Sequence, residues 1–407
     1  MTTPLVLSPD LESSLQDCAG LEKSLTQDPR AAKRVATAVC GLSNAYAAAE
    51  KGELSNLFAD ERHLCAYVLY YVPVNVIKLF PVLDELFRLR DELVFCGESL
   101  SVLDIGCGPG TFLLALLEYC RQHRLGLHDR LHTISLRGLD LQPACLAMAQ
   151  RLLTVYANGS SPGAAFNVEM SFSRGALSGC FERVAEVPAV ARYDLIIAGN
   201  VINEVRAASF TAFAKRLEQS LSDRGAVVII DPGTKQSFRK LLQLRKAFLN
   251  ETALSLFAPC LDSGPCPLED NDKAWCHEKL YWRPPEVVAA IDRHTGFTKD
   301  KGIKYAYMTL TRKPVTAAQS CRAGSSEKLW RVSSYLIKQK GEERLLVCNG
   351  SRRVMLRRLL KNSVDGNRQF AEVRRGDLVS FAGAKQRTAF WDIGPASSFR
   401  IVERDRE

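Results

Sequence analysis

The spacing of hydrophobic residues changes twice along the chain, and these changes predict its organisation. Residues 28 to 95, as in RAAKRVATAVCGLSNAYAAAEKG, carry apolar residues at three- and four-residue spacing, which is the pattern of amphipathic helices. From Ser101 strand-like segments such as SVLDIG and YDLIIAGN alternate with helical segments such as TFLLALLEYCRQH. This alternation is typical of an α/β protein with a parallel sheet covered by helices.

The pattern changes again near residue 315. A polar linker, PVTAAQSCRAGSSE, precedes short strand-like segments separated by Gly, Asn and Asp, which predict a small β-barrel resembling an OB-fold. We therefore expect a helical N-terminal domain at 1–95, an α/β domain at 96–315 that contains a cysteine-rich loop at 257–282, a linker at 316–326 and a β-barrel domain at 327–407.

Composition limits the class of protein. With 46% hydrophobic and 24% charged residues in a chain of 407, there is enough apolar material for two or three cores. We expect no membrane span, because no apolar run reaches about 18 residues. The N-terminus carries acidic residues and no basic region, unlike a signal or transit peptide, so we expect a cytoplasmic, bacterial-type location. Thirteen scattered cysteines are not a disulfide framework, and clustered ones suit a metal better.

Positive charge is concentrated near the C-terminus. The net charge is +9, and residues 322–407 contain 19 Lys and Arg against 10 Asp and Glu. Such an asymmetry favours an acidic partner, most simply nucleic acid.

The stretch LDIGCGPGT, from Leu103 to Thr111, joins a predicted strand to a predicted helix. Its glycines allow a sharp turn and a close approach to a ligand at the positive end of the helix. Asp140 ends the next strand, where a carboxylate can accept hydrogen bonds from ribose hydroxyls.

This arrangement resembles the class I S-adenosylmethionine-dependent methyltransferases, whose first motif is similar to DIGCGPG. The resemblance implies a Rossmann-like domain that binds S-adenosylmethionine as cofactor. The binding residues that it implies are Asp104, Gly106, Cys107, Gly108, Gly110, Asp140, Leu141 and Asn200.

Candidate catalytic residues lie in AGNVINEV, after the fourth predicted strand: Asn200, Asn203 and Glu204. Asn203 and Glu204 could orient a substrate, or could instead cap the helix that begins near Ala207. No general base is evident, so the sequence leaves open whether a methyl group is transferred.

Three cysteines, Cys260, Cys266 and Cys276, lie in one short loop rich in proline and glycine. Thiolates suit zinc or iron–sulphur clusters, but C-x5-C and C-x9-C are not the close pairs of a structural zinc site. Wider spacing with neighbouring prolines favours a 4Fe–4S cluster. The candidates for a fourth ligand are Cys348, Cys321 and His277.

Several stretches together resemble the methyltransferase-like small-subunit ribosomal protein family of bacteria and mitochondria: LSNAYAAAE, AYVLYYVPVNVIKLFPVLDEL, LDIGCGPGT, IIDPGTKQSFRKLLQLRKAFL, APCLDSGPCPL and WCHEKLYW. The resemblance implies a 4Fe–4S cluster on Cys260, Cys266, Cys276 and Cys348. It also implies a monomeric assembly factor whose partners are small-subunit rRNA and ribosomal proteins. An active rRNA methyltransferase and an iron or redox sensor that controls ribosome production are the alternatives.

An rRNA-facing surface is predicted from Lys235, Arg239 and Lys246 and from the run SRRVMLRR. Aromatic residues near this run can either stack on bases or pack in the core, and we favour the core for them: Trp330, Tyr335, Phe381 and Trp391.

Overall fold

The structure is a computed structural model of the chain, and it describes residues 4–49, 58, 60–88, 92–122, 130–159, 167–175, 192–297, 302–320 and 328–403. The chain packs as two compact units. The α/β unit contains Pro4–Asp231 and Leu280–Ile303, and the barrel unit contains Pro232–Lys279 and Lys304–Glu407. The division into four parts expected from the sequence has other boundaries than these two units, and it stays a prediction.

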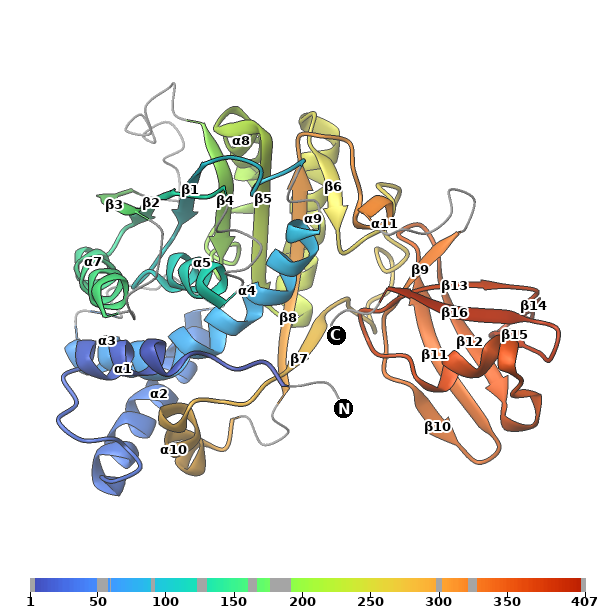
Figure 1. The fold of residues 1–407 in the computed structure, drawn as a ribbon, viewed down its shortest axis with the longest axis horizontal. Coiled ribbons are helices and arrows are strands. Elements are labelled where there is room, and N and C mark those ends of the chain that lie inside the picture. The colour runs from blue at the N-terminus through green and yellow to red at the C-terminus, as the bar shows by residue number, and fades with distance from the viewer. Residues whose placement is uncertain are drawn as a thin grey trace. The chain divides into compact units, whose positions relative to one another are not determined.

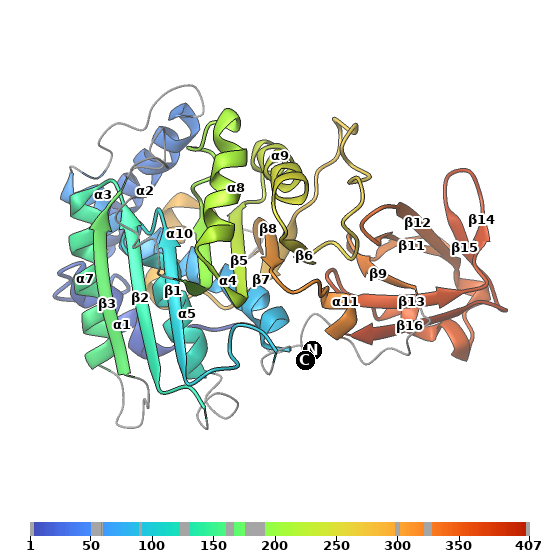
Figure 2. The ribbon, with the colours of Figure 1, turned by 90° about the horizontal axis from the view of Figure 1, so that it is seen from above.

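Five parallel strands form the centre of the α/β unit. Their order is β3-β2-β1-β4-β5, and Figure 2 shows β3, β2 and β1 side by side. The strands are β1 Ser99–Ile105, β2 Thr133–Asp140, β3 Asn167–Arg174, β4 Tyr193–Gly199 and β5 Leu221–Pro232. Parallel neighbours require crossover connections, and the helices in these connections are α5 Thr111–Gln122, α7 Pro143–Asn158 and α8 Phe210–Gln219, preceded by the short η4 Ala207–Ser209. The predicted alternation of strands and helices is thus confirmed.

Helices from the N-terminal segment belong to the same unit. They are α1 Pro9–Cys18, α2 Pro29–Ala49, α3 Glu61–Ala66, the π-helical turn η2 Tyr67–Tyr71 and α4 Val72–Phe87; α10 Glu286–Thr295 joins them from later in the chain. The continuous helix Glu61–Phe87 is long and apolar enough to cross a membrane by length and composition. However, 83% of its most apolar window is buried inside the protein, as in a core helix.

The barrel unit begins with helix α9 Lys235–Glu251 and strand β6 Ser255–Ala258, which pairs antiparallel with β8 Gly302–Thr311. Strand β7 Glu278–Tyr281 starts here, and α11 Ala317–Ser320 follows β8. Between β6 and β7 the chain is irregular. This irregular segment, residues 259–277, carries three of the predicted metal ligands, and we call it the cysteine loop.

The remaining strands form one curved sheet (Figure 1). Strand β9 pairs with β11, β11 with β12, β12 with β15, β16 with β13, and β13 with β9. The order β14-β15-β12-β11-β9-β13-β16 is an open path, so it agrees in part with the predicted OB-like barrel, and we keep the name barrel unit. The elements are β9 Leu329–Val332, β10 Ile337–Gln339, β11 Glu342–Cys348, β12 Arg353–Leu359, η5 Leu360–Asn362, η6 Asp365–Ala371, β13 Leu378–Ala382, β14 Lys385–Gln386, β15 Trp391–Ile393 and β16 Ser398–Glu403.

The core of the barrel explains the aromatic residues noted in the sequence. Trp330 is 3% exposed, and Phe381 and Trp391 pack against the same cluster, so the core interpretation is confirmed for these three. Tyr335 is 42% exposed, and for it that interpretation is wrong.

A buried ion pair lies beside this core. One guanidinium nitrogen of Arg358 lies 2.6 Å from a carboxylate oxygen of Glu343, and both side chains are almost completely buried. A buried charge is tolerated when it is paired and hydrogen-bonded, and Arg358 also donates to the Asn367 carbonyl at 2.6 Å. The last arginine of SRRVMLRR is therefore a structural residue and does not face a partner, which corrects part of the predicted rRNA surface.

Candidate functional site

The four predicted cluster ligands lie around one cavity of about 220 Å³ inside the barrel unit. Cys260, Cys266 and Cys276 reach it from the cysteine loop, and Cys348 reaches it from the end of β11. Cys348, which is 72 or more positions from the other three cysteines in sequence, thus lines the same cavity as they do. Apolar side chains of α9, among them Phe238, Leu241 and Leu242, form another part of the lining.

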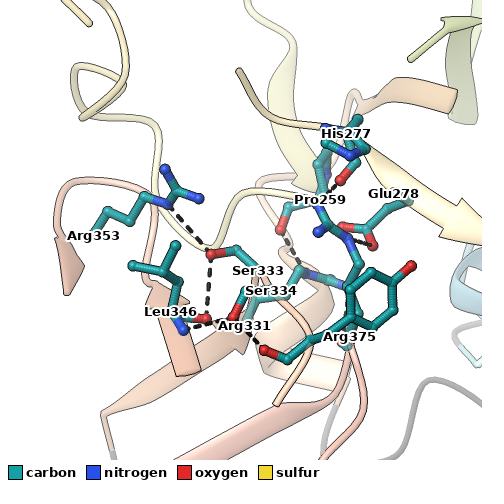
Figure 3. A network of polar contacts seen from close by, with 11 residues as sticks. Pro259, His277, Glu278, Arg331, Ser333, Ser334, Leu346, Arg353 and Arg375 are labelled. Carbon is teal, nitrogen blue, oxygen red and sulfur yellow. Dashed lines mark hydrogen bonds and ion pairs between the residues drawn. The ribbon is translucent and has the colours of Figure 1, made fainter. Parts of the chain in front are cut away.

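Three arginines hold the cysteine loop by its backbone. Arg331 of β9 donates from Nε to the carbonyl oxygen of Pro259 at 2.8 Å, directly before Cys260. Arg245 of α9 donates to the carbonyl of Gly264 at 2.7 Å. Arg375 donates to the carbonyl of His277, directly after Cys276, and pairs with Glu278 at 3.1 Å (Figure 3). The loop is therefore fixed on each side of its cysteines by side chains from three different elements.

A glycine allows the loop to approach Cys348. Gly350 has φ +100, and a Cβ on it would lie 2.6 Å from the backbone nitrogen of Asp262. Only glycine fits such a backbone conformation and such a close contact. The cysteine loop and the β11–β12 turn are in this way packed directly against each other.

Basic residues of α9 contact the loop. Arg239 donates to the carbonyls of Leu268 and Glu269 at 3.2 and 2.7 Å, so the prediction that Arg239 faces rRNA is wrong. Lys246 pairs with the Glu269 carboxylate, but its side chain is 52% exposed, and its contact with rRNA stays a prediction. Lys235 is exposed at the start of α9.

The thiols around the cavity are not gathered around a single point. Among the described residues, no three His, Cys, Asp or Glu side chains converge closely enough to hold one metal ion. Burial raises the pKa of Cys260 to about 11, against the attraction of Arg245, and burial also raises the pKa values of Cys276 and Cys348. Of the alternative ligands, His277 lines the same cavity with its Nδ1 buried and without a hydrogen bond; Cys321 lies outside the described residues.

The glycine-rich loop of the α/β unit follows β1, beside β4, where the strand order reverses. Such a reversal is the usual ligand site of open α/β sheets. Gly106, Gly108 and Gly110 all have positive φ. A Cβ on Gly110 would lie 3.0 Å from Leu153 Cδ1, whereas one on Gly108 would meet nothing within 4 Å. Gly110 thus lets α5 and α7 pack, while Gly108 leaves space for a ligand.

Two carboxylates border this loop. Asp140 accepts from the backbone N–H of Gly108 at 2.8 Å and from that of Gln142 at 2.8 Å, and Leu141, after it, is 37% exposed. Asp104 is completely buried, and neither of its carboxylate oxygens has a hydrogen-bond partner. Burial, and secondarily the nearby Asp140, raises the pKa of Asp104 well above its usual range. An orphaned carboxylate beside an open glycine loop fits a ligand that carries a donor or a positive charge. Cys107 is buried.

The loop after β4 contains the candidate catalytic residues. Asn200 has φ +59, a conformation that costs energy for a residue other than glycine and that often accompanies a functional site. Neither η4 nor α8 has a side-chain cap, so the capping alternative for Asn203 and Glu204 is wrong. The roles of Asn203 and Glu204 in catalysis stay a prediction.

Sequence analysis missed Lys78. This lysine of α4 is 6% exposed and donates to Asn75 at 2.6 Å. Burial lowers the pKa of Lys78 to about 8, against the attraction of Asp231 at the end of β5. A single lysine within the apolar helix sequence VPVNVIKLFPVL was the signal that could have revealed it.

The strand order, the glycine-rich turn and the acid ending β2 together define a Rossmann-like α/β domain of the class I methyltransferase type. The chain belongs to the family described as "Mitochondrial small ribosomal subunit Rsm22", whose sequence model matches residues 62–379. That description gives its members a mitochondrial setting, which corrects the expected cytoplasmic, bacterial-type location.

Methyltransferases are among the solved structures with detectable likeness. Magnesium protoporphyrin IX methyltransferase from Synechocystis PCC 6803 is 13% identical, with 58% of this chain and 80% of that chain covered and a TM-score of 0.32. A ribosomal protein L11 methylase from Lactobacillus delbrueckii subsp. bulgaricus is 15% identical, with 56% and 76% covered and a TM-score of 0.28. Nothing about the activity of this chain follows from likenesses this distant. A search of curated proteins found no match.

Replacing Asp104 by Asn should stabilise the free protein at neutral pH. Because burial raises the pKa of Asp104 above its usual 3.8, the folded state binds this proton more tightly than the unfolded state. The stability that the protonated Asp104 carboxyl contributes near pH 4 is then lost as the pH rises through the raised pKa of Asp104. Without the ionisable group, the unfolding free energy at pH 8 should rise by about 1–3 kcal/mol.

Urea unfolding at pH 5 and pH 8, without methyl donor, measures this effect. The matched control is Asp223→Asn, since the Asp223 side chain is 86% exposed, and it should change stability little at either pH. A greater loss of stability in Asp104→Asn than in the control at pH 8 would show that the carboxylate is needed for folding.

Proposed function

We propose that this protein assists assembly of the small ribosomal subunit, binding rRNA through its basic barrel unit and carrying a 4Fe–4S cluster and S-adenosylmethionine. The observation that carries the proposal is the cavity lined by Cys260, Cys266, Cys276 and Cys348. Membership of a small-ribosomal-subunit family supports the partner, and the excess of Lys and Arg after residue 321 supports contact with RNA.

The donor set supports iron–sulphur chemistry. Four thiols around one cavity are the usual ligand set of a 4Fe–4S cluster, and apolar lining limits access of water. Cys260, Cys266 and Cys276 bind the cluster from the cysteine loop and Cys348 binds it from β11, so that cluster binding joins the loop to the barrel. Metal binding of this kind contributes directly to folding free energy.

The glycine-rich loop supports binding of S-adenosylmethionine. We assign to Asp140 the hydrogen bonds from the ribose hydroxyls, and Gly106, Cys107 and Gly108 border the amino-acid part of the donor, with open space at Gly108. Asn200 borders the expected position of the methyl group. Bound donor supplies an activated methyl group, and whether the protein transfers it is the open alternative of an active rRNA methyltransferase.

Anaerobically purified wild-type protein should contain about four iron and four sulphide ions per chain. Cys260→Ser and Cys348→Ser should each lose most of both, because each removes a thiolate. The control is Cys40→Ser, a half-buried cysteine of α2 outside the cavity, which should keep the full content. Stoichiometric zinc without sulphide would overturn the assignment. Loss of the cluster in Cys321→Ser or His277→Ala, with Cys348→Ser unaffected, would reassign the fourth ligand.

S-adenosylmethionine should bind the wild-type protein with measurable heat in titration calorimetry. Asp140→Ala should weaken that binding at least about tenfold, because two charge-assisted hydrogen bonds to the ribose are lost. The exposed Asp223→Ala serves as the control and should bind normally. An absence of heat with cluster-loaded wild-type protein would refute both donor binding and the methyltransferase alternative.

Ultraviolet crosslinking in cells tests the partner. The wild-type protein should crosslink to small-subunit rRNA and sediment with small-subunit precursors, whereas Cys348→Ser should sediment mainly as free protein, since the loop and barrel are no longer joined. If the wild-type protein neither crosslinks to rRNA nor sediments with the subunit, the proposed function is wrong.

A further inference from the structure

Five strands of the barrel unit form one continuous outer surface (Figure 1). Strand β10 pairs with β11, β11 with β12, β12 with β15, and β15 with β14. Residues in register on neighbouring strands point to the same side of a sheet. One such outward row crosses all five strands, and it consists of Ile337, Arg344, Arg357, Asp392 and Lys385. We call this surface, with the connections at its two ends, the β10–β14 face.

Positive charge dominates this face. Its outward residues, together with the connections at its two ends, include six basic side chains, Lys340, Arg344, Arg353, Arg357, Lys385 and Arg387, against two acidic ones, Glu342 and Asp392.

The arginines are held in place by these two acids. Arg344 lies 2.5 Å from Glu342, and Arg357 lies 2.8 Å from Asp392. Lys340 and Lys385 are exposed. The face therefore has a centre of paired guanidinium groups with exposed ammonium groups at both ends.

Flat groups for stacking lie beside the charges. The Arg357 guanidinium carbon lies 3.8 Å from the centroid of the Phe390 ring, so the guanidinium plane is supported from one side. Tyr335, in the connection from β9 to β10, is the most exposed aromatic residue of the barrel at 42%. Bases of single-stranded RNA stack on aromatic rings and on guanidinium planes, while lysines bind the phosphates.

The face ends at the cysteine cavity. Along β11 the outward positions are Glu342, Arg344, Leu346 and Cys348, and the partner of Cys348 on β12 is Arg353. Both Cys348 and Arg353 line the cavity. One end of the surface thus borders the cysteine cavity.

We propose that the β10–β14 face is the RNA-binding site of this protein and that it takes single-stranded RNA, with bases stacked at Tyr335 and Arg357 and phosphates bound by Lys340 and Lys385. The inference rests on the proposed ribosomal function and gives it a surface and a substrate class. Single strands fit because their bases are free to stack, whereas a duplex offers only its backbone and grooves. OB-type barrels use this face, made of their second and third strands and two adjoining loops, for oligonucleotides.

The test compares two variants with a charge-matched control in the full, cluster-loaded chain. Tyr335→Ala removes a stacking ring, and Lys340→Ala/Lys385→Ala removes two phosphate contacts. The control is Lys361→Ala/Arg368→Ala, which removes two exposed charges from η5 and η6. Fluorescence anisotropy measures binding to a 12-nucleotide single-stranded RNA of mixed sequence and to a 12-base-pair RNA duplex, at 50 and 200 mM salt.

Tyr335→Ala should weaken single-strand binding about tenfold with an unchanged salt dependence. The lysine variant should weaken it by a similar factor and lower the slope of log affinity against log salt by about 1 to 2. The control should change affinity less than about twofold. An equal loss in the control, unchanged binding in both variants, or duplex binding as tight as single-strand binding would each overturn the proposal.

Sedimentation with small-subunit precursors separates this proposal from the function on which it rests. If the variants bind RNA normally but leave the subunit, the face binds a protein and the proposal is wrong, while the ribosomal function stands. Both variants could instead lose RNA affinity and still sediment with the subunit as well as the control does. In that case another surface binds the rRNA. Failure of the wild-type chain to sediment refutes the ribosomal function itself.

Discussion

The barrel unit depends on hydrogen bonds from arginine side chains to the carbonyl oxygens of the cysteine loop. This loop has almost no regular secondary structure, so its backbone polar groups need other partners. Arg245, Arg331 and Arg375 supply them, and a guanidinium has five donors in a fixed plane with which to do so. The same positive charges lie near the thiols, where they favour the ionised form that binds metal.

The α/β unit concentrates its own unfavourable groups around the glycine-rich loop. Asp104 is buried without a hydrogen-bond partner, Lys78 is buried beside Asn75, and Asn200 has a left-handed backbone. Each of these features costs stability in a free protein. A fold keeps such costs where a ligand repays them, and Asp104 and Asn200 lie at the carboxyl ends of the neighbouring strands β1 and β4.

Sequence patterns predicted the regular elements well and the uses of individual charges poorly. Buried strands such as β1 and β4 were clear because both of their faces are apolar, whereas β3 and β14 are too short or too polar to stand out. The cysteines could be grouped because thiols have few other roles in a loop. However, Arg239, Lys246 and Arg358 look like surface residues in any periodic pattern. Only their partners show that Arg239 binds a loop carbonyl, Lys246 pairs with the Glu269 carboxylate and Arg358 pairs with a buried carboxylate.

Strand β11 links the two sites of the barrel unit. Side chains on one face of a strand recur every second residue, so Arg344, Leu346 and Cys348 point the same way. Because β11 is hydrogen-bonded to β9, β10 and β12, Cys348 belongs to the same sheet as the row that contains Ile337 and Arg357. If the proposed cluster binds at Cys348, it would hold one end of the strand that carries part of the proposed RNA site, without needing to contact the RNA.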